Sequence, residues 1–499
     1  MSLRRRPRAG FILGLAALGG CTLAPFYRRP APPVARAWPG EASAPSAPRT
    51  AAADIGWRDF FKDPRLQALI EEALAQNRDL RVAALDVEAA RERYGIQRSA
   101  FLPGLQATGQ ENAQRFAPNV AFPNTPTFTT REYEAGLGFT AYEIDFFGRL
   151  RSLSRGALEN YFGTEEARRS AQIALVSEVA SRYLARLADQ ESLTLARGTF
   201  ASQDDSLRLT RMRFEAGVAT EIDVSQAETS AETARADVAR YARLTQQDEN
   251  ALTLLAGAPL PAASAEAPDF DAERLLAGLP EGLPSDLLER RPDILAAEHT
   301  LRAANADIGA ARAAFFPSIL LTGTYGTAST QLSGLFQAGT QVWTFNPSIN
   351  LPIFTAATNW ASLKLAHVDK RIAIARYEKS IQTAFREVAD ALAGVRTFDE
   401  QVAAQAALVA SNDHAYQLSL MRFRGGIDNY LTVIVSQRAL YSAQQDLIAV
   451  KLQKLQNMVA LYTALGGGWR ETSAGPVPQA EAGPAPPATS TTTAVAPPR

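Results

Sequence analysis

Cysteine and histidine are scarce in this chain, and their scarcity excludes several classes of protein. The 499 residues contain 1 cysteine, Cys21, so no internal disulfide can form. The 3 histidines are scattered singly, without the close spacing of metal ligands. No Ser/His/Asp grouping or phosphate-binding glycine loop stands out, which argues against an enzyme. A formal net charge of -1 provides no basic surplus that would attract nucleic acid.

The N-terminus has the pattern of a targeting segment. Residues 11–18 form a short apolar stretch behind an arginine-rich start, and this stretch is too short to span a bilayer. It ends in Leu18-Gly19-Gly20-Cys21, which resembles the bacterial lipobox. We therefore predict that residues 1–20 are a lipoprotein signal peptide and that Cys21 carries a diacylglycerol and an N-acyl chain. The alternative is an ordinary secretory signal that happens to end at a cysteine.

Two matching glycine turns indicate that the chain is duplicated. Residues 213–223 read RFEAGVATEID, and residues 422–431 read RFRGGIDNYL. Aligning the two RF pairs also aligns Gly217 with Gly426 and Val218 with Ile427. Glycine tolerates the positive φ that ends a helix, so each segment is predicted to be the tip of a helical hairpin.

Each half of the chain repeats one plan of elements. Segments with alternating apolar and polar residues predict strands at about 104–116 and 131–147, and again at about 318–330 and 340–354. The pattern at 342–353 is longer than the roughly 9–11 residues that a membrane strand needs. A proline-free helical pattern at 149–216 would be on the order of 100 Å long, which predicts a coiled-coil tube or rod.

Composition separates these repeats from the rest of the chain. The first repeat spans 54–255 and the second spans 285–469, and residues 256–284 form a Pro/Ala/Gly connector. Residues 21–53 are rich in Pro and Ala and are predicted to form an extended arm. The tail at 470–499 is predicted to be disordered.

Four strands cannot close a barrel alone, and an open sheet edge cannot face lipid. The chain is therefore expected to oligomerise around one shared barrel, with its long helices continuing as a tube. The competing interpretation is a soluble helical protein with two small β-hairpins.

Several short motifs, taken together, resemble one family. They are Trp57 with Phe60, Asp63-Pro64, residues 290–294, Phe316-Pro317, the two RF tips and residues 464–469. This combination resembles the TolC-type outer membrane efflux protein family, in its lipoprotein branch that serves RND pumps. The resemblance implies a mainly α fold with a membrane β-barrel part, in which four strands per chain complete a trimeric barrel that a periplasmic α-helical barrel continues. It also implies a homotrimer in the outer membrane, lipid-anchored and extending into the periplasm, where an adaptor protein and an inner-membrane RND pump dock.

The function that this resemblance implies is the exit duct of a tripartite efflux system for small molecules. It requires no cofactor beyond the acyl chains, and the pump supplies the energy. One alternative is the exit duct of a type I protein secretion system. Another is a lipid-anchored coiled-coil scaffold that conducts nothing.

The resemblance also assigns roles to residues at the two tips. Contacts to the adaptor are expected at Arg213, Gly217, Val218, Ala219, Arg422, Gly426, Ile427 and Asp428. The alternative is a purely structural role, in which the glycines only form the turn. The gate is expected at Leu431, Thr432, Val435 and Asp223. Since the family commonly has carboxylates where this chain has Thr432 and Val435, Leu431 is predicted to act as an apolar seal. Arg422 or Arg424 is expected to pair with Asp223.

Aromatic side chains gather where helices and strands are predicted to meet. They are Phe101, Phe146, Phe147, Phe315, Phe316 and Phe354. They could form an aromatic belt at the inner leaflet or simply pack the neck of the barrel. Asp145, in the same region, is expected to cap a helix or line the base of the barrel.

Overall fold

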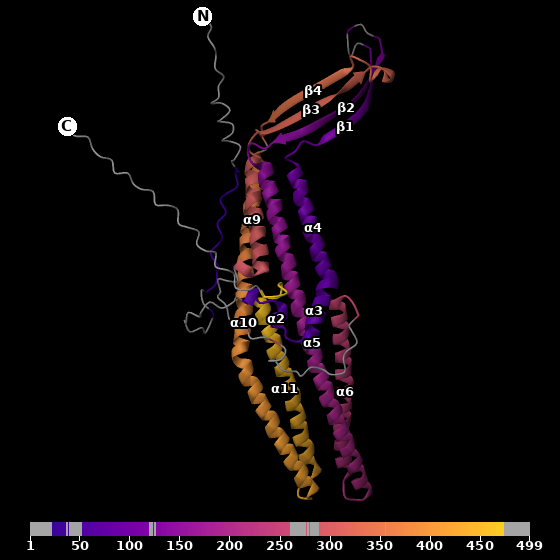
Figure 1. Cartoon of the computed structure of the whole chain (residues 1–499), viewed down its shortest axis with the longest axis vertical. Coiled ribbons are helices and arrows are strands. Elements are labelled where there is room, and N and C mark those ends of the chain that lie inside the picture. The colour runs from indigo at the N-terminus through magenta and orange to yellow at the C-terminus, as the bar shows by residue number, and fades with distance from the viewer. Residues whose placement is uncertain are drawn as a thin grey trace, which may run out of the picture.

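The computed structural model describes residues 22–35, 38, 52–118, 123, 126–259, 276, 279, 289–354 and 356–473. Cys21, the signal peptide 1–20, most of the connector and most of the tail lie outside these ranges. The molecule is long and slender, with a tilted sheet at one end and two helical hairpins at the other (Figure 1). No helix in the described part of the chain is long and apolar enough to cross a membrane.

The sheet has four antiparallel strands in chain order, from β1 to β4. The strands are β1 Leu105–Phe116, β2 Phe128–Ile144, β3 Ser318–Ser329 and β4 Gln341–Asn350. The alternation predicted a strand at 131–147, but β2 begins earlier, because Phe128 still pairs with Phe116, and it ends earlier, because the chain bends at 146–148. A bulge near Ala141 shifts its register against β3. Pro352, whose ring nitrogen has no N–H, lies beyond the end of β4.

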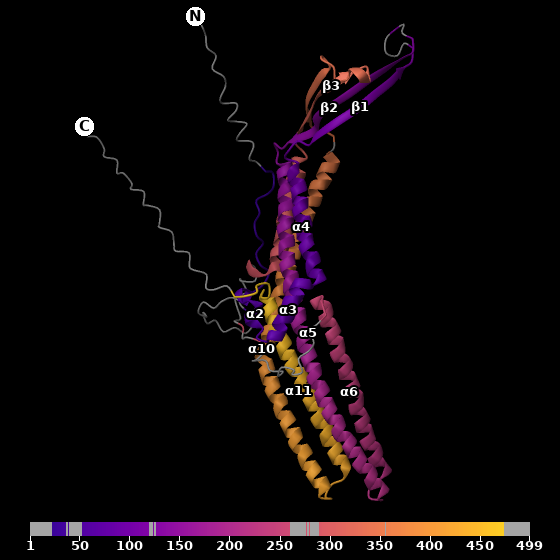
Figure 2. The same cartoon turned by 45° about the vertical axis from the view of Figure 1, so that its right-hand side comes forward.

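Six longer helices carry this sheet. They are α4 Arg78–Ser99, α5 Arg149–Glu215, α6 Glu221–Ala256, α9 Pro292–Ala313, α10 Ala356–Arg424 and α11 Tyr430–Ala464. α5 has 67 residues and α10 has 69, and both run from the base of the sheet to a hairpin tip (Figures 1 and 2). Side-chain caps fix where several helices start: Asn77 accepts from the Leu80 amide at α4, and Asn429 accepts from the Thr432 amide at α11.

The hydrophobic core lies midway along the molecule, where short elements pack on the long helices. These are η1 Ala52–Asp54, α2 Trp57–Phe60 and α3 Pro64–Gln76, while η2 Leu332–Gly334 lies between β3 and β4. The ring of Phe60 stacks on Tyr462 with centroids 4.1 Å apart, which joins α2 to α11. A second cluster joins α9 and α10 around the buried Tyr377. These contacts brace the two repeats against each other at mid-height.

The N-terminal arm, residues 22–35, lies along α9. Asn305 donates to the Pro25 carbonyl at 2.8 Å, and Arg312 donates to the Leu23 carbonyl at 3.1 Å. Thr22 Oγ1 lies 3.3 Å from Ser152 Oγ, in the first turns of α5 next to the sheet. The residue that follows Cys21 is therefore fixed at the end of the helical trunk that adjoins the strands.

Candidate functional site

The strand register separates an apolar face of the sheet from a polar face. Paired residues point to the same side, so Ala107, Leu137, Tyr325 and Trp343 form one row across all four strands. On the opposite side, Gln110 pairs with Glu134, and Thr324 pairs with Thr344. The apolar row is largely exposed, with Leu137 at 64% and Trp343 at 73%. Such a sheet suits a wall between lipid and water.

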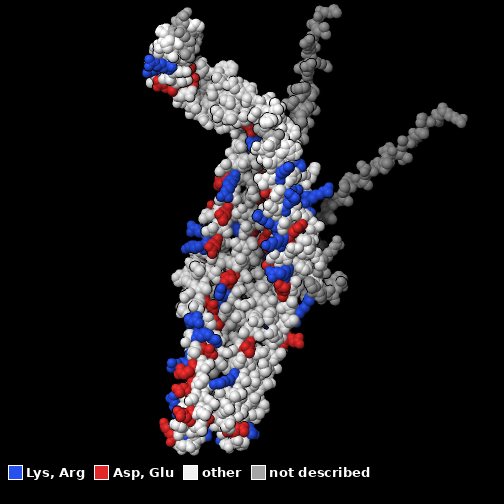
Figure 3. Space-filling view, turned by 180° about the vertical axis from the view of Figure 1, so that it is seen from behind, with Lys and Arg blue, Asp and Glu red and all other residues white. Residues whose placement is uncertain are grey.

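Charged residues of the sheet are concentrated at the end far from the helices (Figure 3). On the apolar face, Arg131 lies 4.0 Å from Glu111, close to the loop between β1 and β2. On the polar face, Glu134 accepts a hydrogen bond from Gln110 at 2.5 Å, and Glu132 lies two residues away on the same face. The described strands place no lysine or arginine on this polar face.

Ion pairs and aromatic contacts fix the junction between sheet and trunk. Arg149 Nε donates to Glu143 at 2.9 Å, and Asp145 caps α5 by accepting from the Arg151 amide at 2.9 Å. Phe147 stacks on Phe316 with centroids 4.7 Å apart. The side chain of Phe354, in contrast, is 98% exposed and stacks on no ring in the described structure. The junction thus contains packed aromatic side chains and one that faces outward.

The first tip is a tight turn closed by a capping box. Gly217 has φ +74°, and the Val218 amide donates to the Arg213 carbonyl at 2.8 Å. Thr220 and Asp223 each accept a hydrogen bond from the other's backbone amide. Hydrogen bonds from Thr220 hold the pKa of Asp223 below its usual value. Val218 remains 64% exposed at the end of the molecule.

The second tip has the same backbone turn but a different closure. Gly426 has φ +71°, and the Ile427 amide donates to the Arg422 carbonyl at 2.9 Å. Arg422 forms a two-pronged ion pair with Asp428, at 2.6 and 3.0 Å. The expectation that Arg422 or Arg424 pairs with Asp223 is therefore not met within one chain. Arg422 has an acceptor in its own turn, Asp223 is engaged by Thr220, and among the described residues no ion pair joins Arg424 to Asp223. Ile427, like Val218, is exposed.

A small apolar cluster joins the two hairpins just above the tips. Tyr430, Val433 and Ile434 of α11 pack against Leu207 of α5 and Ala227 of α6. Sequence patterns did not single out Tyr430, since its role depends on a hairpin more than 200 residues away. The ring of Tyr430 also contacts Phe423, with centroids 5.2 Å apart.

The residues predicted to form the gate occupy one side of the start of α11. Leu431 and Val435 are 46% and 59% exposed, whereas Tyr430, Val433 and Ile434 are buried. Thr432 lies beside Leu431 and donates both its amide and its hydroxyl to Asn429. The structure brings these three together on an exposed face and leaves Asp223 at the other tip.

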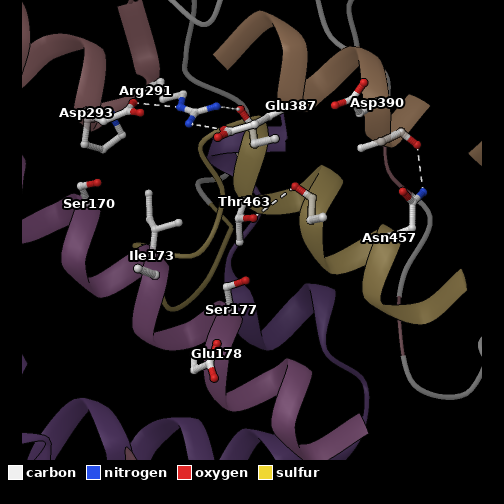
Figure 4. Close-up of a pocket in the computed structure, with 15 residues that line it drawn as sticks. Ser170, Ile173, Ser177, Glu178, Arg291, Asp293, Glu387, Asp390, Asn457 and Thr463 are labelled. Atoms are coloured by element: carbon white, nitrogen blue, oxygen red, sulfur yellow. Dashed lines mark hydrogen bonds and ion pairs between the residues drawn. The ribbon is translucent and has the colours of Figure 1, made fainter. Parts of the chain in front are cut away.

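A cavity of about 560 Å³ lies at mid-height between α5, α9, α10 and α11 (Figure 4). Arg291 joins its walls by bonding Asp293 at 2.8 Å, Glu387 at 2.5 Å and the Ala464 carbonyl at 3.1 Å. These contacts explain the run at 290–294 as a structural joint between the start and the end of the second repeat. Within the described residues, no three of His, Cys, Asp and Glu are arranged to hold a metal ion.

The fold and these surfaces define a class of protein. A sheet with one apolar and one polar face, mounted on a helical trunk that ends in two matched hairpin tips, is the protomer of an outer membrane channel.

Comparison with known proteins places the chain in a family of this class. The family model described as outer membrane efflux protein matches residues 69–258 and 283–467. This chain belongs to that family, as the sequence resemblance predicted.

Relatives and solved structures agree with this assignment. The chain is 51% identical over 456 residues to the probable efflux pump outer membrane protein TtgC of Pseudomonas putida, covering 91% of this chain and 94% of TtgC. It is 44% identical to the outer membrane protein OprJ of Pseudomonas aeruginosa, covering 94% and 97% of the two chains. The open-state structure of the MtrE outer membrane channel of Neisseria gonorrhoeae matches with TM-score 0.81 and 38% identity, covering 91% of this chain and 100% of MtrE.

These matches confirm the predicted fold class and the general function. The chain is mainly helical with four antiparallel strands, and it is an outer membrane efflux component rather than an enzyme. They favour the efflux duct over a secretion duct or a scaffold that conducts nothing.

Proposed function

We propose that three copies of this chain close one membrane barrel and form the exit duct of a tripartite RND-type efflux system. The observation that carries this proposal is the pair of open sheet edges. In the described chain, β1 and β4 each pair with only one strand, while the sheet has the two contrasting faces of a membrane wall. Pairing β4 of one copy with β1 of the next would remove every edge.

The duplication of the trunk supports the same ring. α9 packs against both α5 and α10, whereas its duplicate α4 packs mainly against α5. The remaining side of α4 exposes Val82, Leu85 and Ile96. In a ring, α10 of a neighbouring copy would cover this side, as α5 covers α9 within one chain. Leu365 of α10 is 60% exposed and available for that contact.

Lipid anchoring at Cys21 fits the course of the arm. Thr22 is fixed near Ser152 at the base of the sheet, so acyl chains on the preceding residue would start beside the membrane. We infer that the mature protein begins at Cys21. Cys21→Ala should abolish incorporation of labelled palmitate, and incorporation that persists in this variant would contradict the inference.

The two tips fit a partner that docks end-on. Val218 and Ile427 are apolar and exposed beyond turns that glycine alone would close, which supports adaptor contacts at 213–219 and 422–428. Gly217→Trp with Gly426→Trp should abolish crosslinking to the adaptor while trimers persist. Since both glycines have positive φ, Val218→Ser with Ile427→Ser is a second variant that leaves the backbone unstrained. Unchanged crosslinking in both variants would refute the tip contacts.

The cargo is proposed to be small molecules, including drugs and solvents, that the inner-membrane pump selects. Relatives are named as antibiotic and toluene efflux components. The proposal is tested by purifying the acylated protein, looking for heat-resistant trimers and recording single-channel conductance in planar bilayers. A scaffold would form oligomers without conductance, and that outcome would refute the duct.

A further inference from the structure

Both arginines of the described strands lie on the apolar face of the sheet. They are Arg115 of β1 and Arg131 of β2, and β3 and β4 contain neither lysine nor arginine. Arg131 lies opposite Ala113, and Arg115 lies opposite Thr129. Since residues two apart on a strand point to the same side, Arg131 shares its face with Leu137. Both guanidinium groups therefore project from the side that the proposed barrel turns to lipid.

The arginines stand where the apolar band of this face ends. Between Ile144 and Tyr133, this face of β2 carries no charged residue. At about 3.3 Å per residue and a tilt of about 40°, that stretch has a height of about 28 Å, close to the roughly 25 Å of the apolar band of a membrane barrel. Arg131 is the next residue on this face beyond Tyr133. The proposed function places the trunk in the periplasm, so this end of the sheet meets the headgroups of the outer leaflet.

The two guanidinium groups retain most of their hydrogen-bond donors. The side chain of Arg131 is 63% exposed, and the nearest carboxylate oxygen, on Glu111, lies 4.0 Å from its Nε. That oxygen already accepts from the Tyr133 hydroxyl at 3.1 Å. Arg115 is exposed and, among the described residues, pairs with no acid. An anion that approaches along the bilayer surface therefore finds the terminal nitrogens of both side chains available.

The spacing of the two arginines suits a phosphate with two negative charges. They are diagonal neighbours across β1 and β2, which places the bases of their side chains about 7–8 Å apart. Each guanidinium can donate two parallel hydrogen bonds to phosphate oxygens, so one phosphate between them relieves the repulsion of the like charges. A phosphomonoester carries about −1.5 to −2 charges at pH 7, whereas the phosphodiester of an ordinary phospholipid carries a single one. The hydroxyl of Thr129, exposed on the same face, supplies a further donor.

We propose that Arg115 and Arg131 bind a lipid of the outer leaflet whose headgroup carries a phosphomonoester. The partner is a lipid because the site continues the apolar face, where acyl chains pack below the headgroup. Glu132 and Glu134 point to the opposite face, so an anionic lipid reaches the arginines without meeting the acids of the proposed lumen. The bound lipid holds the far end of the β1–β2 hairpin at a fixed height in the membrane. This inference rests on the proposed function for the direction in which the sheet points.

The test counts the lipids bound to the purified full-length protein in neutral detergent by native mass spectrometry. The probe is lipid A, a glycolipid with two phosphomonoesters, and the comparison lipids are dephosphorylated lipid A and phosphatidylglycerol. The unchanged protein should bind lipid A at least about tenfold more tightly than either comparison lipid. Arg115→Gln with Arg131→Gln should remove this preference and leave the affinity for dephosphorylated lipid A unchanged. Because both side chains are exposed, the variant should keep the thermal midpoint of the unchanged protein.

Arg208→Gln with Arg235→Gln is the matched control, because it removes the same charge from exposed arginines of the first hairpin that pair with acids of their own helices. This variant should bind lipid A as the unchanged protein does. Equal binding of lipid A with and without its phosphates would overturn the proposal, as would a preference that survives the loss of both sheet arginines. Equal binding of phosphatidylglycerol would overturn it too, since any anionic lipid would then suffice.

Single-channel conductance of the same preparation separates this proposal from the proposed function. A channel that conducts without the preference for phosphorylated lipid A would refute only the lipid site. A protein that shows the preference without conducting would refute only the duct.

Discussion

The guanidinium of Arg213 lies 4.8 Å from the centre of the Phe423 ring, although 210 residues separate the two in sequence. Each belongs to an RF pair at the end of a long helix. The arginine of the first pair therefore contacts the phenylalanine of the second pair. Arg422, the counterpart of Arg213, instead pairs with Asp428 in its own turn. The two tips therefore have the same backbone conformation but are stabilised by different side-chain contacts.

Removing the Arg213 side chain should loosen the contact between the hairpins. A cation over an aromatic ring at an exposed site contributes about 0.5–1 kcal/mol, so Arg213→Ala should speed local opening by about two- to fivefold. Amide hydrogen exchange of residues 430–434 measures this. Arg211→Ala is the control, since Arg211 pairs with Glu228 inside the first hairpin. Equal exchange in both variants would show that the cation–ring contact does not hold the tips.

Apolar side chains at the start of α11 should resist ion flow in the assembled duct. Leu431 and Val435 are exposed on one side of the helix, and Thr432 between them carries no charge. Apolar groups at a narrow point gate by expelling water. Leu431→Ser with Val435→Ser should therefore raise single-channel conductance several-fold, while Val218→Ser at the first tip should leave it unchanged.

The same reasoning predicts weak block of this gate by multivalent cations. The carboxylate of Asp223 caps α6 in the other hairpin, and the carboxylate of Asp428 in the second tip is paired with Arg422. Block by a trivalent cation from the periplasmic side should therefore be weaker than in relatives with acidic rings. Strong block that is insensitive to Asp223→Asn would contradict an apolar seal.

Two carboxyls between α5 and α6, the buried Asp248 and the half-buried Asp189, should make the stability of the first hairpin sensitive to pH. Burial, and then the neighbouring carboxylate of Asp248, raises the pKa of Asp189 from 3.8 to about 6. Charged groups nearby are Arg182, Arg186 and Arg240. The folded state thus binds this proton more tightly than the unfolded state does. The stabilisation is complete below about pH 4 and is lost as the pH rises through about 6.

Asp189→Asn should remove this pH dependence. After allowance for partial exposure, the contribution is about 1–2 kcal/mol, measured as the change in urea stability between pH 4 and 7. The control is Asp204→Asn, at an exposed position on α5, whose urea stability should depend on pH as that of the unchanged protein does. If the pH dependence of urea stability were unaltered in Asp189→Asn, other titratable groups would be responsible for it.

Periodicity and glycine patterns predicted the elements of this chain well, because the local order of apolar and polar residues indicates long helices and alternating strands. α5 runs nearly over the predicted residues 149–216, and both tips turn at the predicted glycines. Contacts between distant segments could not be predicted in this way. The partner of Arg422 depends on the geometry of its turn, and the Tyr430 cluster depends on how two hairpins lie together.

The N-terminal arm is a second case in which contacts between distant segments could not be predicted from the sequence. Its Pro/Ala composition predicted an extended segment, but not that Tyr27 and Arg29 bond Glu298 of α9. Glu298 is 2% exposed and also accepts from Arg302 at 2.7 Å. Nothing in the local sequence of α9 marks this glutamate as buried, because its partners come from the arm and from the next helical turn.

Charge selection in the open duct should arise in the sheet rather than at the tips. Glu132 and Glu134 lie on the polar face, which has no lysine or arginine in the described strands, and Glu143 on that face is paired with Arg149. In a ring of three copies, the first two would form an acidic band in a water-filled lumen bounded by low-dielectric walls. Such a band concentrates cations.

Glu132→Gln with Glu134→Gln should therefore lower the potassium-to-chloride permeability ratio at least about twofold, read from the reversal potential in a salt gradient. The effect should shrink at high salt, where charges are screened within about 3 Å at 1 M. Glu111→Gln is the control, since Glu111 lies beside these residues but on the apolar face, where it accepts from Tyr133 at 3.1 Å. A selectivity that follows Glu111 instead would mean that the two faces of the sheet have been assigned the wrong way round.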